Sequence, residues 1–220
     1  MSASKTCQIS LIVLAAGTSS RMMAEIGTNK LLLTTPNGTT LLETTLQIYT
    51  ALPFHEILLI LPPVLPSTLA FSIPPTPRLR TLINGDNASG MASSLVLGVT
   101  NISETSKGFM IALADMPLVQ TSTIEALCTV FCEKNSPNAI CIPTVESKRG
   151  NPVVFGAAYK QELTELSGDV GAKSVIQRHT EHICFVETAD EGIVLDIDTL
   201  ENWENFLERK SRLKSTHVNL

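Results

Sequence analysis

Several sequence features that mark whole classes of protein are missing from this chain of 220 residues. Its longest apolar run, residues 9–16, is too short to span a membrane. Residues 1–8 are polar and lack the hydrophobic core of a signal peptide. No Cys-x-x-Cys pair occurs, so we expect neither a zinc site nor a disulfide framework, but reduced thiols in a cytoplasmic protein. The five cysteines are scattered: Cys7, Cys128, Cys132, Cys141 and Cys184.

Positive charge is also scarce, because 16 lysines and arginines stand against 21 acidic residues, for a net charge of −5. We therefore expect no nucleic-acid partner, which would require a broad basic surface. A nucleotide remains possible, since one cationic loop can bind a triphosphate in an acidic protein. The histidines have no metal-ligand spacing, and we predict solvated or packing roles for all four: His55, His179, His182 and His217.

Short apolar segments alternate with longer amphipathic ones along the whole chain. We predict strands at residues 9–14, 56–61, 79–83, 109–113, 139–142, 153–155, 183–186 and 194–197. Helices are predicted at residues 41–52, 91–99, 121–133, 159–166, 172–178 and 200–210. This alternation predicts one α/β domain over residues 1–220, a Rossmann-like three-layer sandwich with a mostly parallel central sheet. Residues 62–77 hold six prolines and are a candidate loop or lid, and residues 212–220 a frayed tail.

Ligands of such sheets bind beyond the carboxyl ends of the strands. After the first predicted strand come small residues, then Arg21 and, beyond Gly27, Lys30. Small residues let backbone N–H groups approach a phosphate, while the two cations could neutralise a triphosphate and its departing pyrophosphate. A tight turn would explain Gly17 alone, but not this ordered combination. The predicted nucleotide-binding residues here are Leu14, Ala15, Ala16, Gly17, Thr18 and Ser19.

Three carboxylates are candidate metal ligands. Asp115 follows the predicted strand 109–113, so its side chain would emerge at the same edge of the sheet. Asp196 and Asp198 stand two apart on a predicted strand and would share a face. Such oxygens suit Mg²⁺. Asp115 could instead cap a turn, and Asp198 could equally be the N-cap of the last helix.

The segment 84–94 is predicted to be a loop that runs into a helix N-terminus. Its backbone and its serine hydroxyls could bind the edge of a base, although helix capping would also explain the serines. The residues predicted to contact the nucleotide here are Gly90, Met91, Ser93 and Ser94.

The loop lacks both G-x-x-x-x-G-K-S/T and G-x-G-x-x-G, which argues against ATPase and dinucleotide-binding functions. It instead resembles the signature of the molybdenum cofactor guanylyl- and cytidylyltransferase family. Five further segments occur in the order found in that family and extend the resemblance over nearly the whole chain. They are Gly90-Met91-Ala92-Ser93-Ser94-Leu95, Ala114-Asp115-Met116-Pro117-Leu118-Val119, Arg149-Gly150-Asn151-Pro152-Val153, Gly168-Asp169-Val170-Gly171-Ala172 and Asp196-Ile197-Asp198-Thr199.

This resemblance implies a fold of the nucleotide-diphospho-sugar transferase type, with nucleotide binding in the N-terminal half and acceptor binding in the C-terminal half. It implies catalytic roles for Arg21, Lys30 and Asp115, with Mg²⁺ as cofactor. The reaction would transfer CMP from CTP to a phosphorylated pterin, and a downstream molybdoenzyme or its chaperone would receive the product. The acceptor pocket would include Gly150, Asn151, Pro152, Gly168, Asp169 and Gly171, for which turn formation is an equal explanation.

The chain departs from the family pattern in three places. Lys30 stands nine positions after Arg21 rather than five, Asn151 replaces a common histidine, and Lys173 replaces a common arginine. Alanine at position 16, where the guanylyl branch tends to carry glycine, favours CTP. Three alternatives stay open: a guanylyl- or sugar-1-phosphate nucleotidyltransferase, a non-catalytic nucleotide-binding or cofactor-delivery protein, and a metal-independent interaction protein.

Overall fold

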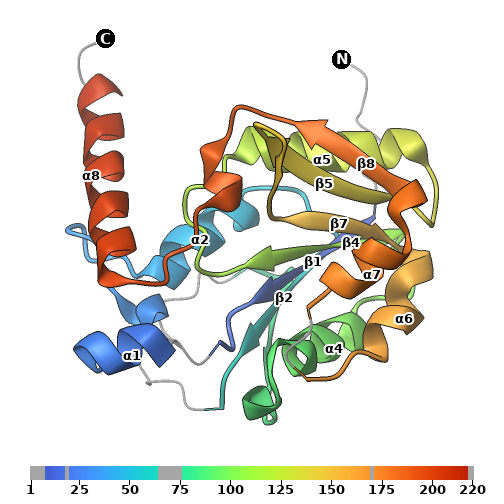
Figure 1. The fold of residues 1–220 in the computed structure, drawn as a ribbon, viewed down its shortest axis with the longest axis horizontal. Coiled ribbons are helices and arrows are strands. Elements are labelled where there is room, and N and C mark those ends of the chain that lie inside the picture. The colour runs from blue at the N-terminus through green and yellow to red at the C-terminus, as the bar shows by residue number, and fades with distance from the viewer. Residues whose placement is uncertain (1–7, 18–19, 64–75, 169–170, 218–220) are drawn as a thin grey trace.

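The computed structural model describes residues 8–17, 20–63, 76–168 and 171–217, and these build one mixed sheet (Figure 1). Its strand order is β3-β2-β1-β4-β7-β5-β6, and β8 pairs with β5. Neighbours among β1 to β4 are parallel, as are β5 and β8, whereas β7 runs antiparallel to both β4 and β5. The strands are β1 (Ile9–Leu14), β2 (Glu56–Leu61), β3 (Leu79–Ile83), β4 (Gly108–Leu113), β5 (Ile140–Val145), β6 (Lys148–Arg149), β7 (Val153–Gly156) and β8 (Ile183–Glu187). The predicted mostly parallel α/β fold is confirmed.

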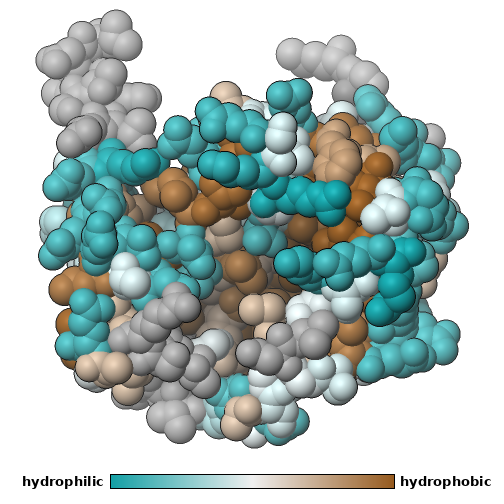
Figure 2. Space-filling model, viewed as in Figure 1, coloured by the Kyte–Doolittle hydropathy of each residue, from teal (hydrophilic) through white to brown (hydrophobic). Residues whose placement is uncertain are grey.

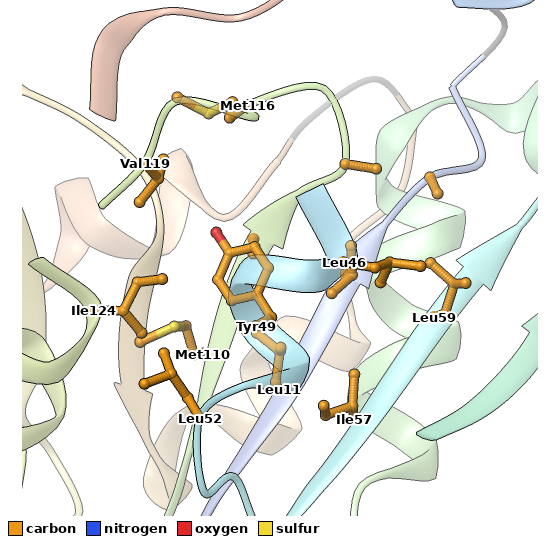
Figure 3. Packing of buried hydrophobic residues seen from close by; sticks show 14 of the residues in the cluster. Leu11, Leu46, Tyr49, Leu52, Ile57, Leu59, Met110, Met116, Val119 and Ile124 are labelled. Atoms are coloured by element: carbon orange, nitrogen blue, oxygen red, sulfur yellow. The ribbon is translucent and has the colours of Figure 1, made fainter. Parts of the chain in front are cut away.

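Helices cover both faces of this sheet and create two cores. One core contains residues of α2, α5 and α8, and the other contains residues of α4, α6 and α7. Tyr49 and Leu46 of α2 pack on Leu11 of β1 and Leu59 of β2 in the first core (Figure 3). The helices are α1 (Ser20–Ile26), α2 (Leu41–Thr50), α4 (Met91–Asn101), α5 (Thr121–Lys134), α6 (Lys160–Thr164), α7 (Lys173–Arg178) and α8 (Leu200–His217).

The strand β1 divides these two cores because its side chains alternate between the faces of the sheet. Leu11 and Val13 belong to the first core, while Ile12 belongs to the second. Each is fully buried, which contributes on the order of 2 kcal/mol per side chain. A continuous apolar run therefore forms this strand, because both of its faces are covered.

Four predicted elements differ from the structure. Residues 194–197 form no strand. Val194 ends the 3₁₀ turn η5 (Glu191–Val194), which Asp190 caps by accepting a hydrogen bond from the Gly192 N–H, and residues 195–197 are irregular. The family pattern leaves four extra positions between Arg21 and Lys30, which we assign to residues 23–26 of a lengthened loop; these residues lie in helix α1 instead. The helix predicted at 159–166 is split between the turn η3 (Ala157–Tyr159) and α6. The tail predicted to fray at residue 212 continues α8 as far as His217.

Among the described residues, no helix is both long and apolar enough to cross a bilayer. Most of the proline-rich candidate lid, residues 64–75, lies outside the described residues.

Candidate functional site

The first candidate loop leaves the sheet between its two neighbouring strands. The Ala15 N–H donates to the Ile60 carbonyl, and the Ala114 N–H donates to the Leu14 carbonyl, so the ladder ends just beyond β1 and β4. Ala15 and Ala16 are buried, and the chain then emerges at Gly17. In the view of Figure 1, Figure 2 shows a hollow with an apolar floor near these strand ends, rimmed by hydrophilic side chains.

Gly17 is not required by the fold. A methyl group built on it would meet nothing within 4 Å, and its backbone is not in the left-handed region. The open space over its backbone is what a phosphate-binding loop needs. Thr18, Ser19 and the side chain of Arg21 lie outside the described part of the structure, so their predicted roles stay predictions.

Lys30 lies buried at the start of the turn η1 (Lys30–Leu32), although a lysine side chain is usually solvated. Asn29 caps this turn, since its Oδ1 accepts the Leu31 N–H at 3.0 Å. The Lys30 ammonium pairs with Asp115 Oδ2 at 2.6 Å and with Asp198 Oδ1. The structure thus brings together a lysine and two aspartates that the sequence singled out separately.

Asp196 completes a group of three carboxylates with Asp115 and Asp198. One oxygen from each lies within 4.8 Å of those of the other two. The two segments are tied by the Ile197 N–H, which donates to the Asp115 carbonyl at 2.9 Å. Irregular backbone, rather than the expected strand, therefore holds Asp196 and Asp198 beside Asp115.

The N-cap of α8 is Thr199, so the alternative role predicted for Asp198 is wrong. The Asn202 N–H donates to Thr199 Oγ1 at 3.2 Å, and Asn202 Oδ1 accepts the Thr199 N–H at 3.1 Å. This reciprocal pair gives hydrogen-bond partners to two backbone N–H groups at the start of the helix, those of Thr199 and Asn202. The Asp198 carboxylate is directed to Lys30 instead.

The buried charges alter one another's protonation. Burial lowers the pKa of Lys30, but the charges and hydrogen bonds of Asp115 and Asp198 outweigh it and raise the pKa above 10.5. Burial raises the pKa of Asp115 above 3.8 against the opposing effect of Lys30, and the charge of Asp196 adds to the rise. Asp115 Oδ1 is buried and accepts no hydrogen bond from the described residues. A buried carboxylate oxygen without a donor is costly unless a cation balances it.

The second candidate loop is held by an asparagine that sequence reasoning did not select. Asn84 follows β3 and donates through Nδ2 to both Ser93 Oγ and Ser94 Oγ at 2.8 Å. Ser93 in turn donates to the Gly90 carbonyl. The two hydroxyl groups connect Asn84 to the first turn of α4, but they do not cap the helix, which has no side-chain cap hydrogen bond. Asn84 could have been found as a polar residue directly after a strand that ends at the ligand edge.

Two glycines predicted to contact the acceptor lie beside this same helix N-terminus. The Gly168 carbonyl accepts the Ala92 N–H at 3.2 Å. A methyl group on Gly171 would lie 3.1 Å from Met91 Sδ. Asp169 lies outside the described residues.

The remaining acceptor candidates form the corner between β6 and β7. A methyl group on Gly150 would lie 2.4 Å from the Ile193 carbonyl, which accepts the Asn151 N–H at 2.9 Å. The Asn151–Pro152 peptide bond is cis. Close packing accounts for the glycine here, and the corner contacts η5, the turn that precedes Asp196.

A comparison with known protein families shows to which of them the chain belongs. The MobA-like NTP transferase domain matches residues 11–183, which is most of the chain. The chain belongs to this family. The predicted reaction class, nucleotidyl transfer, is that of the family, and the transferase fold is confirmed.

Solved structures agree over nearly the full length. A mycobacterial homologue of Rv0371c, from strain JC1, is 25% identical with a TM-score of 0.78, over 93% of this chain and 98% of its own. Rv0371c of Mycobacterium tuberculosis is 25% identical with a TM-score of 0.73, over 91% and 98%. A nucleotidyl transferase of Methanothermobacter thermautotrophicus shares the fold at 21% identity and a TM-score of 0.74, over 94% and 99%. None of the curated proteins compared with the chain matches it.

Proposed function

We propose that this nucleotidyltransferase transfers CMP from CTP to the phosphate of molybdopterin or molybdenum cofactor and releases pyrophosphate. The observation that carries the proposal is the meeting of Lys30 with Asp115 and Asp198 at the edge of the sheet where the Gly17 loop emerges. One cation and several carboxylates at a phosphate-binding edge are the parts that phosphoryl chemistry requires.

The three aspartates suit Mg²⁺. The donor set is all oxygen, as a hard dication prefers, and the partnerless Asp115 Oδ1 is a ready ligand. When bound, Mg²⁺ would neutralise phosphate charge. Rv0371c, one of the similar proteins, has a structure in complex with manganese, which supports a divalent cofactor.

Lys30 and Arg21 would perform electrostatic work in this reaction. The Lys30 ammonium, kept protonated by its carboxylate partners, would stabilise the charge that develops on pyrophosphate. Arg21 would bind phosphate oxygens through its planar fork. The acceptor phosphate is largely ionised at neutral pH, with a second pKa of about 6, so no general base is needed. Positioning and charge neutralisation would account for catalysis.

The choice of CTP rests on Ala15 and Ala16. Both methyl groups are buried, whereas the guanylyl branch of the resembled family tends to carry a glycine here. The acceptor would lie near the Gly150 corner and the Gly168 segment, and the product would pass to a molybdoenzyme or its chaperone.

A pyrophosphate-release assay with CTP, GTP, UTP and ATP, with molybdenum cofactor as acceptor, tests the proposal. We expect turnover with CTP, and a loss of about 100-fold or more for Lys30→Ala and Asp115→Asn. Glu104→Gln is the control, because its side chain is 90% exposed. Wild-type turnover of Lys30→Ala at saturating CTP would refute the role of Lys30.

The nucleotide profile separates the alternatives. A clear preference for GTP would refute the choice of CTP. Tight binding of CTP without turnover for any acceptor would favour a nucleotide-binding or cofactor-delivery protein.

A further inference from the structure

Two histidines lie close together at the end of the sheet opposite the carboxylate site, where the parallel strands begin. His179 directly precedes the turn η4 (Thr180–His182), and His182 is the last residue of this turn, which leads directly into β8. Sequence spacing predicts solvated or packing roles for both. However, residues three apart eclipse one another in a 3₁₀ turn. The two imidazole rings accordingly lie parallel, 8° apart in plane and 6.0 Å between centroids.

A carboxylate lies between the two rings. Glu181 Oε1 is 3.9 Å from His179 Nδ1 and 3.7 Å from His182 Nδ1. One ring nitrogen of each histidine and one Glu181 oxygen lie within 4.8 Å of one another. Ligand atoms of a tetrahedral zinc site are about 3.4 Å apart, given metal–ligand bonds near 2.1 Å. Closing such a site would require side-chain rotations that shorten spacings of up to 4.8 Å by about 1.4 Å.

A hydrogen bond to a neighbouring side chain holds one nitrogen of each ring, Nε2 of His179 and Nδ1 of His182. His179 Nε2 lies 2.7 Å from Glu162 Oε2, so it donates to this carboxylate and leaves a lone pair on Nδ1. The Tyr159 hydroxyl donates to the Asn138 carbonyl at 2.8 Å, so it accepts from His182 Nδ1, also at 2.8 Å. His182 then carries its lone pair on Nε2, so Nε2 would be its ligand atom and the exposed Glu181 side chain would rotate toward it. Such outer hydrogen bonds typically orient histidines that bind metals.

The aromatic support of this cluster is rigid. Tyr159 is only 3% exposed and packs edge-on against both Phe155 and His179. Its hydroxyl is held by hydrogen bonds to both the Asn138 carbonyl and His182.

The cluster is separate from the carboxylate site. It contacts α6 and α7, which lie on the opposite side of the molecule from α1 and α8 in Figure 1. Its donors also differ, because imidazole nitrogen selects zinc-like ions, whereas the three aspartates offer only oxygen.

We propose that His179, Glu181 and His182 bind a transition-metal dication of the zinc type, with Glu162 and Tyr159 as positioning residues. All three ligands come from residues 179–182, so the ion would order the turn before β8, which the Glu162–His179 pair connects to α6.

Equilibrium dialysis of the whole chain against Zn²⁺ tests this, after treatment with chelator and in excess Mg²⁺ to occupy the carboxylates. We expect wild-type protein and His55→Ala to retain one Zn²⁺ per chain. His179→Ala, His182→Ala and Glu181→Gln should each weaken binding by tenfold or more, and Tyr159→Phe by about tenfold. His55 is a fair control because it is an exposed histidine whose ring hydrogen-bonds to Thr105, outside the cluster.

Asp115→Asn separates the two sites, because it should lose Mg²⁺-dependent turnover while it keeps the Zn²⁺. Equal Zn²⁺ binding by wild-type protein and the His179→Ala variant would overturn the proposal. So would loss of Zn²⁺ in Asp115→Asn alone. Glu181 is 61% exposed, so the Glu181→Gln result stands even if a histidine variant fails to fold.

Discussion

Two glycines of this chain stand in opposite environments, and the same substitution should affect them differently. Gly17 faces open space at the end of β1, whereas Gly98 lies in the middle of α4 against Ile12 of β1. A methyl group on Gly98 would lie 2.5 Å from Ile12 Cγ2. One glycine is therefore available for a ligand, and the other is needed for packing.

Gly17→Ala should leave the free energy of unfolding nearly unchanged but raise the KM for CTP about tenfold. The added methyl group would stand where phosphate approaches the backbone, and one lost hydrogen bond of about 1.4 kcal/mol corresponds to that factor. Steady-state kinetics and urea denaturation of the same preparation check both parts. An unchanged KM would place the phosphates elsewhere.

Gly98→Ala should destabilise the protein by about 1–2 kcal/mol. Overpacking costs about 1–3 kcal/mol, which exceeds the gain of up to about 1 kcal/mol from helix propensity. Ile12 is β-branched and cannot easily rotate away. Urea denaturation measures the loss. In the Ile12→Ala background, Gly98→Ala should cost less stability, because the side chain that clashes with the new methyl group has been removed. Strictly additive losses in the double variant would contradict the clash.

Among the secondary-structure elements, hydrogen bonds of Glu56 connect the beginning of β2 to three neighbouring segments. Its carboxylate accepts hydrogen bonds from Ser10 Oγ of β1, from the Ser103 N–H, and from Arg80 of β3. Burial raises the pKa of Glu56, but the Ser103 N–H and the two side chains outweigh it and lower the pKa below 4.5. The ionised form is therefore stabilised by folding.

Glu56→Gln should cost about 1–3 kcal/mol of stability at pH 7. A carboxylate whose pKa is lowered on folding stabilises above its unfolded pKa and loses that contribution as pH falls through the folded value. The difference between wild type and variant should thus shrink below pH 4.5. Denaturation curves from pH 7 to pH 3 measure it. A difference that is constant over this range would point to packing rather than charge.

On the scale of the whole molecule, the candidate site joins segments from every part of the chain. CTP with Mg²⁺ would contact the loops after β1 and β3 as well as Lys30 and the aspartates. At 100 times its dissociation constant, a ligand stabilises the folded state by about 2.7 kcal/mol. For a chain of this size, that raises the melting temperature by roughly 5–10 °C.

Asp115→Asn should abolish the part of this thermal shift that depends on Mg²⁺. Each variant is compared with itself, with and without ligand, so that a change in intrinsic stability does not enter. Chelator should have the same effect on wild-type protein. A thermal shift that is unaffected by both Asp115→Asn and chelator would contradict the presence of a metal at Asp115.

Most of the fold could be predicted from the sequence because its central strands are buried on both faces and read as continuous apolar runs. The same signal failed near residue 194, where Ile193 and Ile197 are buried within a 3₁₀ turn and irregular backbone. Burial alone does not distinguish such a segment from a strand. The two-residue strand β6 and the short helix α1 have too few residues for a period to show.

The candidate site, like the fold, could be predicted from the sequence only in part. The position of Asp115 at the same sheet edge as the Gly17 loop followed from the rule that ligands bind where parallel strands end. Its meeting with Lys30 and Asp198 did not, because these two residues lie in a 3₁₀ turn and in irregular backbone. The choice of Thr199 over Asp198 as the cap of α8 depends on one hydroxyl, which no periodicity encodes. The pairing of His179 with His182 depends on a 3₁₀ turn that was not predicted.

The contact between Lys30 and Asp198 spans 168 positions of a chain of 220 residues. During synthesis the ribosome completes β1 to β4, and with them most of the first core, long before Asp198 has been made. A nascent chain can therefore fold its sheet while it still lacks part of the carboxylate group. The proposed activity, by contrast, has to await Asp198, so a chain that stops before this residue would keep its sheet but lack a carboxylate of the site, as well as Trp203 and Phe206 of the first core.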